Sequence, residues 1–221
     1  MLRLPGCYQP NDRQRPRARD IPAQDWGLPQ DAVVLANFSH ASKYAPGLFD
    51  LWCALLRKDP RRLLWLLCED AEVQANLRRE AQGRNVAPER LYFAAPLPAQ
   101  QHLDRLRRAD LVLDTFPYGG HTLTSDALWA GTPVLTLCGE TFASRVAASL
   151  LADVGMDELV AHDELEYLQK AEALLQDPPR LRAWRGHLDQ GRDTFALFDP
   201  AAYARKFEAA VLTLVGQRWT P

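Results

Sequence analysis

The chain has 221 residues, enough for one well-buried domain of ordinary size, and its 47% hydrophobic and 24% charged residues are typical of a globular protein. A formal net charge of −2 argues against a basic nucleic-acid-binding surface and a polybasic membrane patch. We find no apolar run of membrane-spanning length, no signal peptide and no CxxC spacing among the four cysteines, and therefore expect a cytoplasmic protein with reduced thiols.

The first 30 residues differ from the rest of the chain. Prolines alternate there with charged residues, without helical or strand periodicity. The pattern predicts a linker or extended arm, packed peripherally or poorly ordered, ahead of a domain over residues 31–221. Such a start also suggests that a preceding domain is missing from this chain.

From Asp31 onward, apolar strand-like runs alternate with helical stretches. The expected strands are Val33–Phe38, Leu63–Leu67, Leu91–Ala94, Leu111–Leu113, Val134–Leu137 and a weaker one at Leu159–Val160. The expected helices are Pro46–Arg57, Asp70–Gln82, Ala99–Arg108, Thr122–Ala130, Thr141–Val154, Asp163–Gln176, Pro179–Arg192 and Pro200–Val215. This order predicts an α/β fold, a Rossmann-like, doubly wound sheet of about six mostly parallel strands.

Ligands of such sheets bind beyond the carboxyl ends of the strands. Polar residues gather in the loops that follow four strands: Ser39–Tyr44, Ala95–His102, Thr115–His121 and Cys138–Thr141. The first strand is not followed by GxGxxG, which disfavours a nicotinamide-dependent dehydrogenase. The sequence also lacks HExxH, a hydrolase-like Ser/His/Asp order and a metal-like carboxylate cluster, so we expect no metal site.

The most informative segment is Leu113–Pro133, in which a buried strand, a glycine turn and a hydroxyl-rich helix start follow one another. This geometry suits phosphate, because free N–H groups and the positive end of the helix dipole face the anion. Thr122 is either a plain N-cap or a phosphate contact. Asp126, one turn later, is either a first-turn acid or an acceptor for ribose hydroxyls.

Three other residues gain interest from their places in the loops. Lys43 follows the first strand and either contacts a diphosphate or is an ordinary surface lysine. His102 and Arg105 are three residues apart and share one helix face, where they either meet a base or are simply half-buried.

A second glycine turn, Gly139–Arg145, leads into another helix, for which we expect Thr141 as the N-cap.

Together these stretches resemble the C-terminal catalytic lobe of the O-GlcNAc transferase and SPINDLY-type glycosyltransferases, which have GT-B architecture. The motifs DTFPYGGHT, SDALWAGTPV and GETFASRVA are specific, and the resemblance covers nearly the whole chain. The matching stretches are Leu4–Asp12, Asn37–Lys43, Arg62–Leu67, Ala95–Arg105, Asp110–Pro133 and Pro133–Ser149.

The resemblance implies an inverting, metal-independent transfer from a UDP-sugar, with UDP-GlcNAc as the expected donor, a protein as acceptor and no cofactor. Lys43 would contact the diphosphate and, with the helix dipole, stabilise the leaving UDP in place of a divalent ion. The other implied contacts are uracil at His102 and Arg105, phosphate at His121 and Thr122, and ribose at Asp126.

Several positions depart from the family pattern. His40 stands where an amide is usual and Ser42 where an aromatic residue is common. Leu123 replaces a second threonine, for which Thr124 partly substitutes, and Ala99 replaces a lysine. We retain His40 and Thr124 as candidate substrate contacts, and expect these changes to affect donor affinity and sugar identity.

Members of this family also carry a TPR superhelix and an N-terminal catalytic lobe, and neither lies in this chain. We therefore expect the chain to be a fragment, half of a split enzyme or a degenerate remnant. We expect it alone to bind UDP weakly and to transfer no sugar. Another hexosyltransferase, an epimerase-like GT-B lobe and a non-catalytic nucleotide-binding or interaction module remain alternatives. We expect the last helix to leave an apolar stripe partly exposed, or covered by a second copy in a homodimer.

Overall fold

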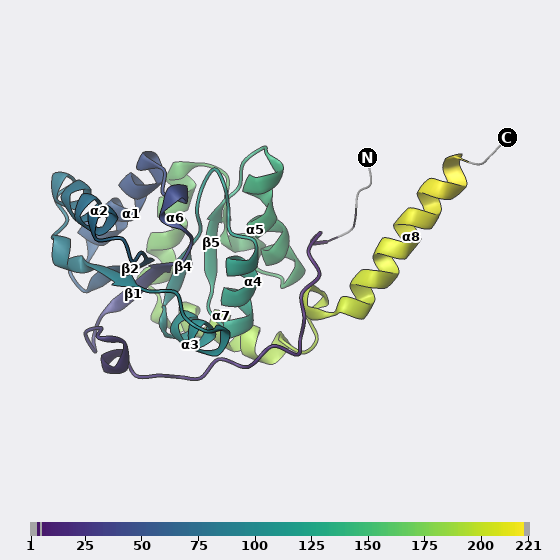
Figure 1. Cartoon of the computed structure of the whole chain (residues 1–221), viewed down its shortest axis with the longest axis horizontal. Coiled ribbons are helices and arrows are strands. Elements are labelled where there is room, and N and C mark those ends of the chain that lie inside the picture. Colours follow the sequence, from purple (N-terminus) through teal and green to yellow (C-terminus); the bar gives the residue numbers. More distant parts are fainter. Residues whose placement is uncertain (1–3, 5, 219–221) are drawn as a thin grey trace.

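The computed structural model describes residue 4 and residues 6–218, with a parallel sheet at its centre (Figure 1). The strands are β1 Val33–Asn37, β2 Arg62–Leu67, β3 Leu91–Ala94, β4 Leu111–Leu113, β5 Val134–Leu137 and β6 Val160–Ala161. They are ordered β3-β2-β1-β4-β5-β6, and every neighbouring pair is parallel. The expected doubly wound α/β sheet is confirmed, with strand ends displaced by about one residue.

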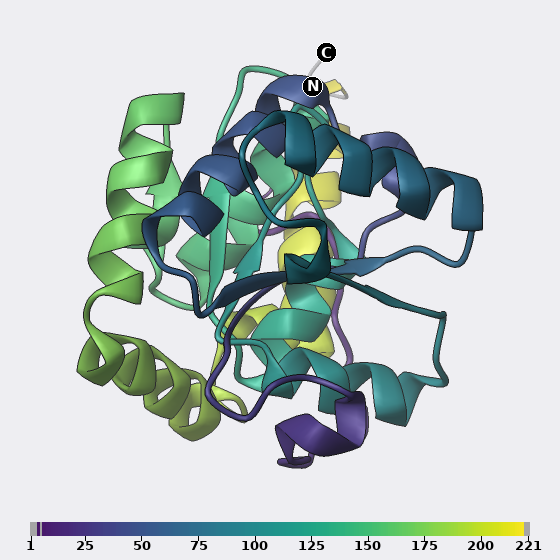
Figure 2. The ribbon, with the colours of Figure 1, turned by 90° about the vertical axis from the view of Figure 1, so that its left-hand side faces the viewer.

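Helices connect the strands and cover both faces of the sheet. They are α1 Pro46–Lys58, α2 Ala71–Gly83, α3 Ala99–Arg108, α4 Thr122–Ala130, α5 Phe142–Asp153, α6 Glu164–Leu175, α7 Pro178–Gly191 and α8 Pro200–Arg218. Single turns of 3₁₀ helix lie at Ala23–Trp26, Ala41–Lys43, Pro88–Arg90, Asp157–Leu159 and Ala196–Phe198. Figure 2 shows α1 and α2 on one side of the sheet and α3 on the other, with α3 in contact with α4.

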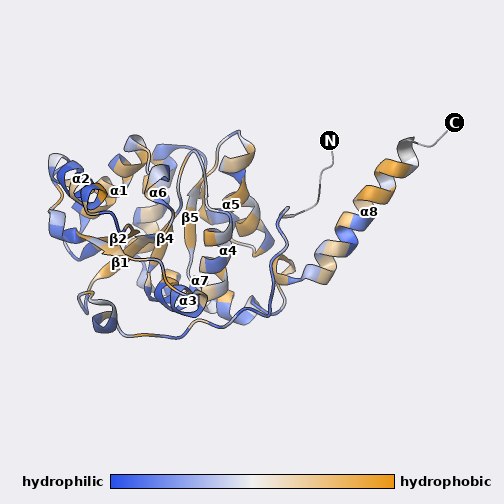
Figure 3. Cartoon of the chain, viewed as in Figure 1, coloured by the Kyte–Doolittle hydropathy of each residue, from blue (hydrophilic) through white to orange (hydrophobic). Residues whose placement is uncertain are grey.

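Burial on both faces explains why the strands read as unbroken apolar runs. Val34, Leu35 and Ala36 in β1 are fully buried. Hydropathy follows the same arrangement, since the strands are apolar and the outer helices carry polar faces (Figure 3). The four cysteines are free thiols, of which Cys138 alone is partly exposed.

The helix starts confirm one of the expected caps and overturn the other. The Thr141 hydroxyl accepts the Ser144 N–H at the start of α5, as expected. Thr122 is not the N-cap of α4, because the helix begins at Thr122 and the preceding His121 occupies the cap position. Neither residue caps the first turn with its side chain, so that turn keeps its donors available.

The N-terminal arm, residues 6–30, runs along the outside of the domain (Figure 1). It has more apolar anchors than its composition suggests, because Cys7, Ala23 and Leu28 join the core. Residues 1–3 and 5 of the expected linker lie outside the described residues. The domain boundary at residue 30 stays a prediction.

Helix α8 extends away from the sheet domain (Figure 1). Its exposed apolar side chains are Phe207, Val211, Leu212, Leu214 and Val215, which confirms the expected partly exposed stripe. The homodimer stays a prediction. Among the helices that the structure describes, none combines the length and apolar character needed to cross a membrane.

One buried carboxylate joins β4, the glycine turn and β5. Asp114 accepts hydrogen bonds from the backbone N–H groups of Thr115 (2.8 Å) and Gly120 (2.6 Å) and from the Thr136 hydroxyl (2.7 Å). Complete burial raises its pKa from 3.8 to about 6, against the opposing effect of these hydrogen bonds and of Lys43. Asp114 therefore fixes the glycine turn that follows β4 at the carboxyl edge of the sheet.

Replacing Asp114 by asparagine should flatten the pH dependence of stability. Between pH 4 and 6 the folded protein holds the Asp114 proton while the unfolded chain releases it, so this residue's contribution to stability falls as pH rises. The asparagine amide does not titrate. We compare the free energy of unfolding of Asp114→Asn with that of wild type by urea unfolding. We expect this difference to shift in favour of the variant by on the order of 3 kcal/mol as the pH rises from 4 to 7. A variant-to-wild-type difference independent of pH would contradict this assignment.

Candidate functional site

The loop after β1 meets the glycine turn after β4 at the carboxyl edge of the sheet. The Lys43 ammonium donates to the Gly119 carbonyl at 3.2 Å, and its nitrogen lies 4.0 Å from the centroid of the Tyr118 ring. Burial lowers the pKa of Lys43, and the Asp114 carboxylate opposes that shift. Lys43 therefore places a positive charge beside the start of α4.

His40 lies on the same loop, exposed to solvent. Its Nδ1 accepts the backbone N–H of Ser42 and lies 2.9 Å from the Ser42 hydroxyl oxygen. These contacts cap the 3₁₀ turn Ala41–Lys43. In this arrangement His40 supports the loop that carries Lys43.

His121 stands at the start of α4 among three aromatic rings. It stacks on Tyr118 with a centroid distance of 5.5 Å, and Phe142 and Tyr8 meet it edge-on. The Tyr8 hydroxyl lies 2.9 Å from His121 Nδ1. Burial first, and the charge of Lys43 second, lower the pKa of His121. The ring is thus held in place at the glycine turn in its neutral form.

The two threonines of the first turn have different surroundings. Thr122 is exposed, as a ligand contact requires. Thr124 is 1% exposed, and its hydroxyl donates to the Gly120 carbonyl at 3.1 Å. In this structure Thr124 braces the glycine turn from within instead of lining its surface.

Asp126 lies one turn further along α4. One carboxylate oxygen is 2.6 Å from Arg15 Nη1 of the N-terminal arm, and the other is 3.8 Å from His102 Nε2 of α3. Burial raises the pKa of Asp126, and Arg15 opposes that shift. The structure therefore brings Asp126 and His102 together.

His102 and Arg105 share one face of α3, as their spacing predicts. Arg105 Nε donates to His102 Nδ1 at 3.0 Å, and Arg105 Nη1 donates to the Ala95 carbonyl at 2.6 Å. Because Nδ1 accepts a hydrogen bond, the proton of the neutral ring is on Nε2, which faces Asp126. Burial, with the adjacent guanidinium, lowers the pKa of His102 to about 4.

Arg105 itself is only 2% exposed and lies over the Phe38 ring. Burial lowers its pKa to about 10. Most of its surface is therefore occupied by protein, and its clearest role in the structure is to orient His102.

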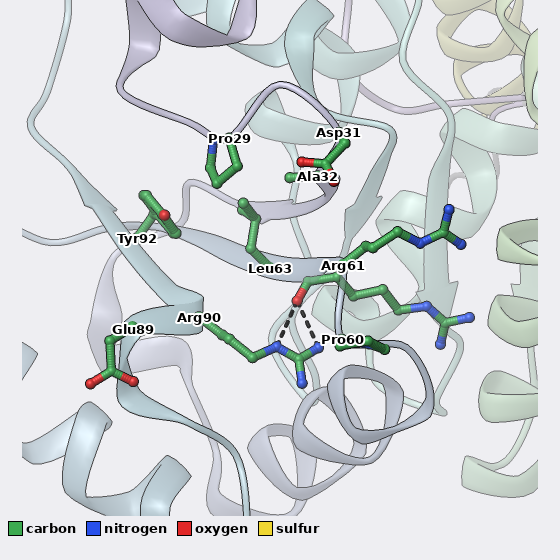
Figure 4. Close-up of a pocket in the computed structure, with 10 residues that line it drawn as sticks. Pro29, Asp31, Ala32, Pro60, Arg61, Leu63, Glu89, Arg90 and Tyr92 are labelled. Atoms are coloured by element: carbon green, nitrogen blue, oxygen red, sulfur yellow. Dashed lines mark hydrogen bonds between the residues drawn. The ribbon is translucent and has the colours of Figure 1, made fainter.

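Two cavities lie near the ends of the strands. One of about 240 Å³ has Pro29, Arg61, Arg90 and Tyr92 among its lining residues, and Figure 4 shows Arg90 donating to a backbone carbonyl there. It lies where β2 and β3 begin, at the edge opposite Lys43. Another, of about 320 Å³, lies beside His40 at the carboxyl end of β2. Only the second adjoins the candidate site.

Sequence reasoning did not single out Asp114, Tyr8 or Arg15. An acid directly before a glycine turn at the end of a buried strand was a usable signal for Asp114. Tyr8 and Arg15 had none, because their partners lie 113 and 111 residues away in the sequence.

Known proteins resemble this chain over most of its length. The family described as "Glycosyl transferase family 41" matches residues 17–207. The Arabidopsis thaliana protein named "Probable UDP-N-acetylglucosamine--peptide N-acetylglucosaminyltransferase SEC" is 33% identical over 94% of this chain. A Caenorhabditis elegans protein named UDP-N-acetylglucosamine–peptide N-acetylglucosaminyltransferase is 36% identical over 87% of this chain.

The solved structure of a mutant of the Thermobaculum terrenum O-GlcNAc transferase superposes with a TM-score of 0.86, at 32% identity over 95% of this chain. This likeness confirms the fold of a GT-B glycosyltransferase lobe. The chain spans 22% of the Arabidopsis protein, 16% of the Caenorhabditis protein and 40% of the bacterial chain. By the family match over residues 17–207, the chain belongs to glycosyltransferase family 41.

Proposed function

We propose that this chain forms the donor-binding half of an inverting, metal-independent protein O-glycosyltransferase, with UDP-GlcNAc as the donor. The observation that carries the proposal is the meeting of Lys43 with the glycine turn at the start of α4, whose first turn has no side-chain cap. A cation and free backbone donors at one place suit a diphosphate. The family membership and the names of the relatives support the sugar and the peptide acceptor.

The proposed chemistry assigns the leaving-group end to Lys43. An acceptor hydroxyl attacks the anomeric carbon, the bond from that carbon to the β-phosphate oxygen breaks, and UDP leaves with the bonding electrons. Lys43 and the dipole of α4 stabilise the negative charge that develops on the diphosphate. The hydroxyl proton passes to a base that we do not assign to this chain.

The nucleoside end is proposed for Asp126, His102 and Arg105. An ionised carboxylate only accepts hydrogen bonds, which suits ribose hydroxyls. His102 lies 3.8 Å from Asp126 and supplies a flat, neutral ring beside the ribose position. His121 and Thr122 complete the proposed phosphate contacts at the helix start.

The direct test is calorimetric titration of the 221-residue chain with UDP, UDP-GlcNAc and UDP-glucose. We expect UDP to bind in the high micromolar range or more weakly, on the order of 10⁻⁴ M, because water reaches a donor site with one open wall. We expect no transfer to peptide by this chain alone, because positioning of the acceptor needs groups beyond this lobe. Absence of UDP binding at millimolar ligand would refute the proposed function.

Removing the Lys43 ammonium should weaken diphosphate binding alone. We expect Lys43→Ala to cost about 1.5–3 kcal/mol in UDP affinity, roughly 10- to 150-fold, and to leave uridine affinity unchanged. Lys58→Ala is the matched control, because Lys58 ends α1 at the opposite edge of the sheet. Equal UDP affinity in Lys43→Ala and wild type would place the phosphate site elsewhere.

Removing the Asp126 carboxylate should weaken the binding of UDP and of uridine by the same factor. UDP and uridine each carry the ribose, so we expect Asp126→Ala to lower both affinities about tenfold, the scale of a hydrogen bond to a charged group. Titrations in which UDP and uridine compete for one preparation of the protein measure the loss of affinity for each ligand under the same conditions. A loss confined to UDP would mean that Asp126 acts on the phosphates.

A further inference from the structure

The N-terminal arm runs along α4 from Ser125 to Trp129, and α4 is the helix that carries the candidate ribose contact. The Ser125 hydroxyl donates to Asn11 Oδ1 at 2.6 Å, and Trp129 Nε1 donates to the Pro16 carbonyl at 2.8 Å. Asn11 is buried in this contact. The arm is therefore attached on both sides of Arg15, which lies between these two contacts.

Arg15 is held more tightly than a surface arginine. Its Nη1 donates to Asp126 at 2.6 Å, its Nη2 to the Ser125 hydroxyl at 3.2 Å, and its Nε to the Asp12 carbonyl at 2.9 Å. The guanidinium carbon lies 5.0 Å from the Trp129 ring centroid and 5.3 Å from that of Phe198. Three hydrogen bonds and two aromatic faces leave the guanidinium a single orientation.

The hydrogen bond from Arg15 uses only one oxygen of the Asp126 carboxylate. The side chains of both residues are about one-fifth exposed, so the pair is screened by little water. The second oxygen faces His102 Nε2 at 3.8 Å, which is beyond hydrogen-bond distance. One acceptor atom of Asp126 therefore remains open toward α3, where the nucleoside is proposed to lie.

We propose that Arg15 is a positioning residue of the donor site, which keeps Asp126 ionised and turns its free oxygen toward the ribose hydroxyls. This inference rests on the proposed function. In the proposed site Arg15 does not contact the nucleotide and acts through Asp126. The N-terminal arm thereby contributes a residue to the donor site.

The electrostatics of Asp126 support this role. The titratable groups that face it are Arg15 from the arm and His102 from α3, with Arg105 behind His102. His102 is neutral above about pH 4, so Arg15 supplies the compensating charge. Burial raises the pKa of Asp126 and Arg15 lowers it, so loss of Arg15 would raise it further. A protonated carboxyl accepts ribose hydroxyls less well.

The test compares UDP with its 2′,3′-dideoxy analogue in wild type and Arg15→Gln. Wild type should prefer UDP, and Arg15→Gln should lose about tenfold or more in UDP affinity while the dideoxy analogue binds almost as before. Loss of Arg15 raises the pKa of Asp126, so the preference of Arg15→Gln for UDP should recover only at a higher pH than the preference of wild type, where the carboxylate is restored. Arg15→Lys keeps the positive charge but loses the planar guanidinium, so its UDP affinity should lie between those of wild type and Arg15→Gln.

Arg19→Gln is the matched control for attachment of the arm. Arg19 joins the same arm to buried Asp104 on α3 at 2.6 Å, away from Asp126. Arg17→Gln removes an exposed pair with Asp193 and should have no effect. Melting temperatures of all variants separate unfolding from loss of the site.

Two results would overturn the inference. Equal losses for UDP and the dideoxy analogue in Arg15→Gln, matched by Arg19→Gln, would show that Arg15 only fastens the arm. A UDP preference in Arg15→Gln equal to that of wild type would show that Asp126 does not need its partner. If wild type binds neither nucleotide, the proposed function itself fails, which the titration of wild type reveals first.

Discussion

The three hydrogen bonds to the buried Asp114 carboxylate determine where the rest of the site can lie. They fix the backbone after β4 so that the Gly119 carbonyl faces Lys43 and α4 begins two residues after Gly120. A side chain at Gly120 has no room, because its Cβ would lie 2.7 Å from Thr124 Oγ1 and 2.9 Å from Asp114 Oδ1. The glycine turn therefore depends on a buried acidic residue.

Burial determines which side chains at the carboxyl edge of the sheet are charged and which are neutral. It lowers the pKa of both His102 and His121, which keeps the rings neutral near neutral pH. Lys43 then supplies the cation at one end of the site, and Asp126, balanced by Arg15, supplies the anion further along α4. A ligand with a negative end and a hydroxyl-bearing end would find complementary groups in that order.

Local patterns predicted the sheet, the helices and the meeting of Lys43 with the glycine turn, because parallel strands bring their following loops to one edge. The spacing of His102 and Arg105 likewise predicted their shared face. Of the two alternatives for Thr122, the N-cap is wrong, because α4 begins at Thr122 itself and Asp114 holds the turn before it. Tyr8 and Arg15 were beyond local reasoning, and the nucleotide contacts stay predictions.

The position of the arm in the sequence also affects how the protein is made. Arg15 and Asp126 are 111 residues apart, so on a ribosome adding 5–20 residues per second the arm waits roughly 6–22 s for its partner to be synthesised. During that interval α4 does not exist and the arginine-rich arm is open to trypsin-like proteases. Docking of the arm therefore cannot precede synthesis of α4, and protection of residues 6–20 from cleavage would report that the arm has docked on it.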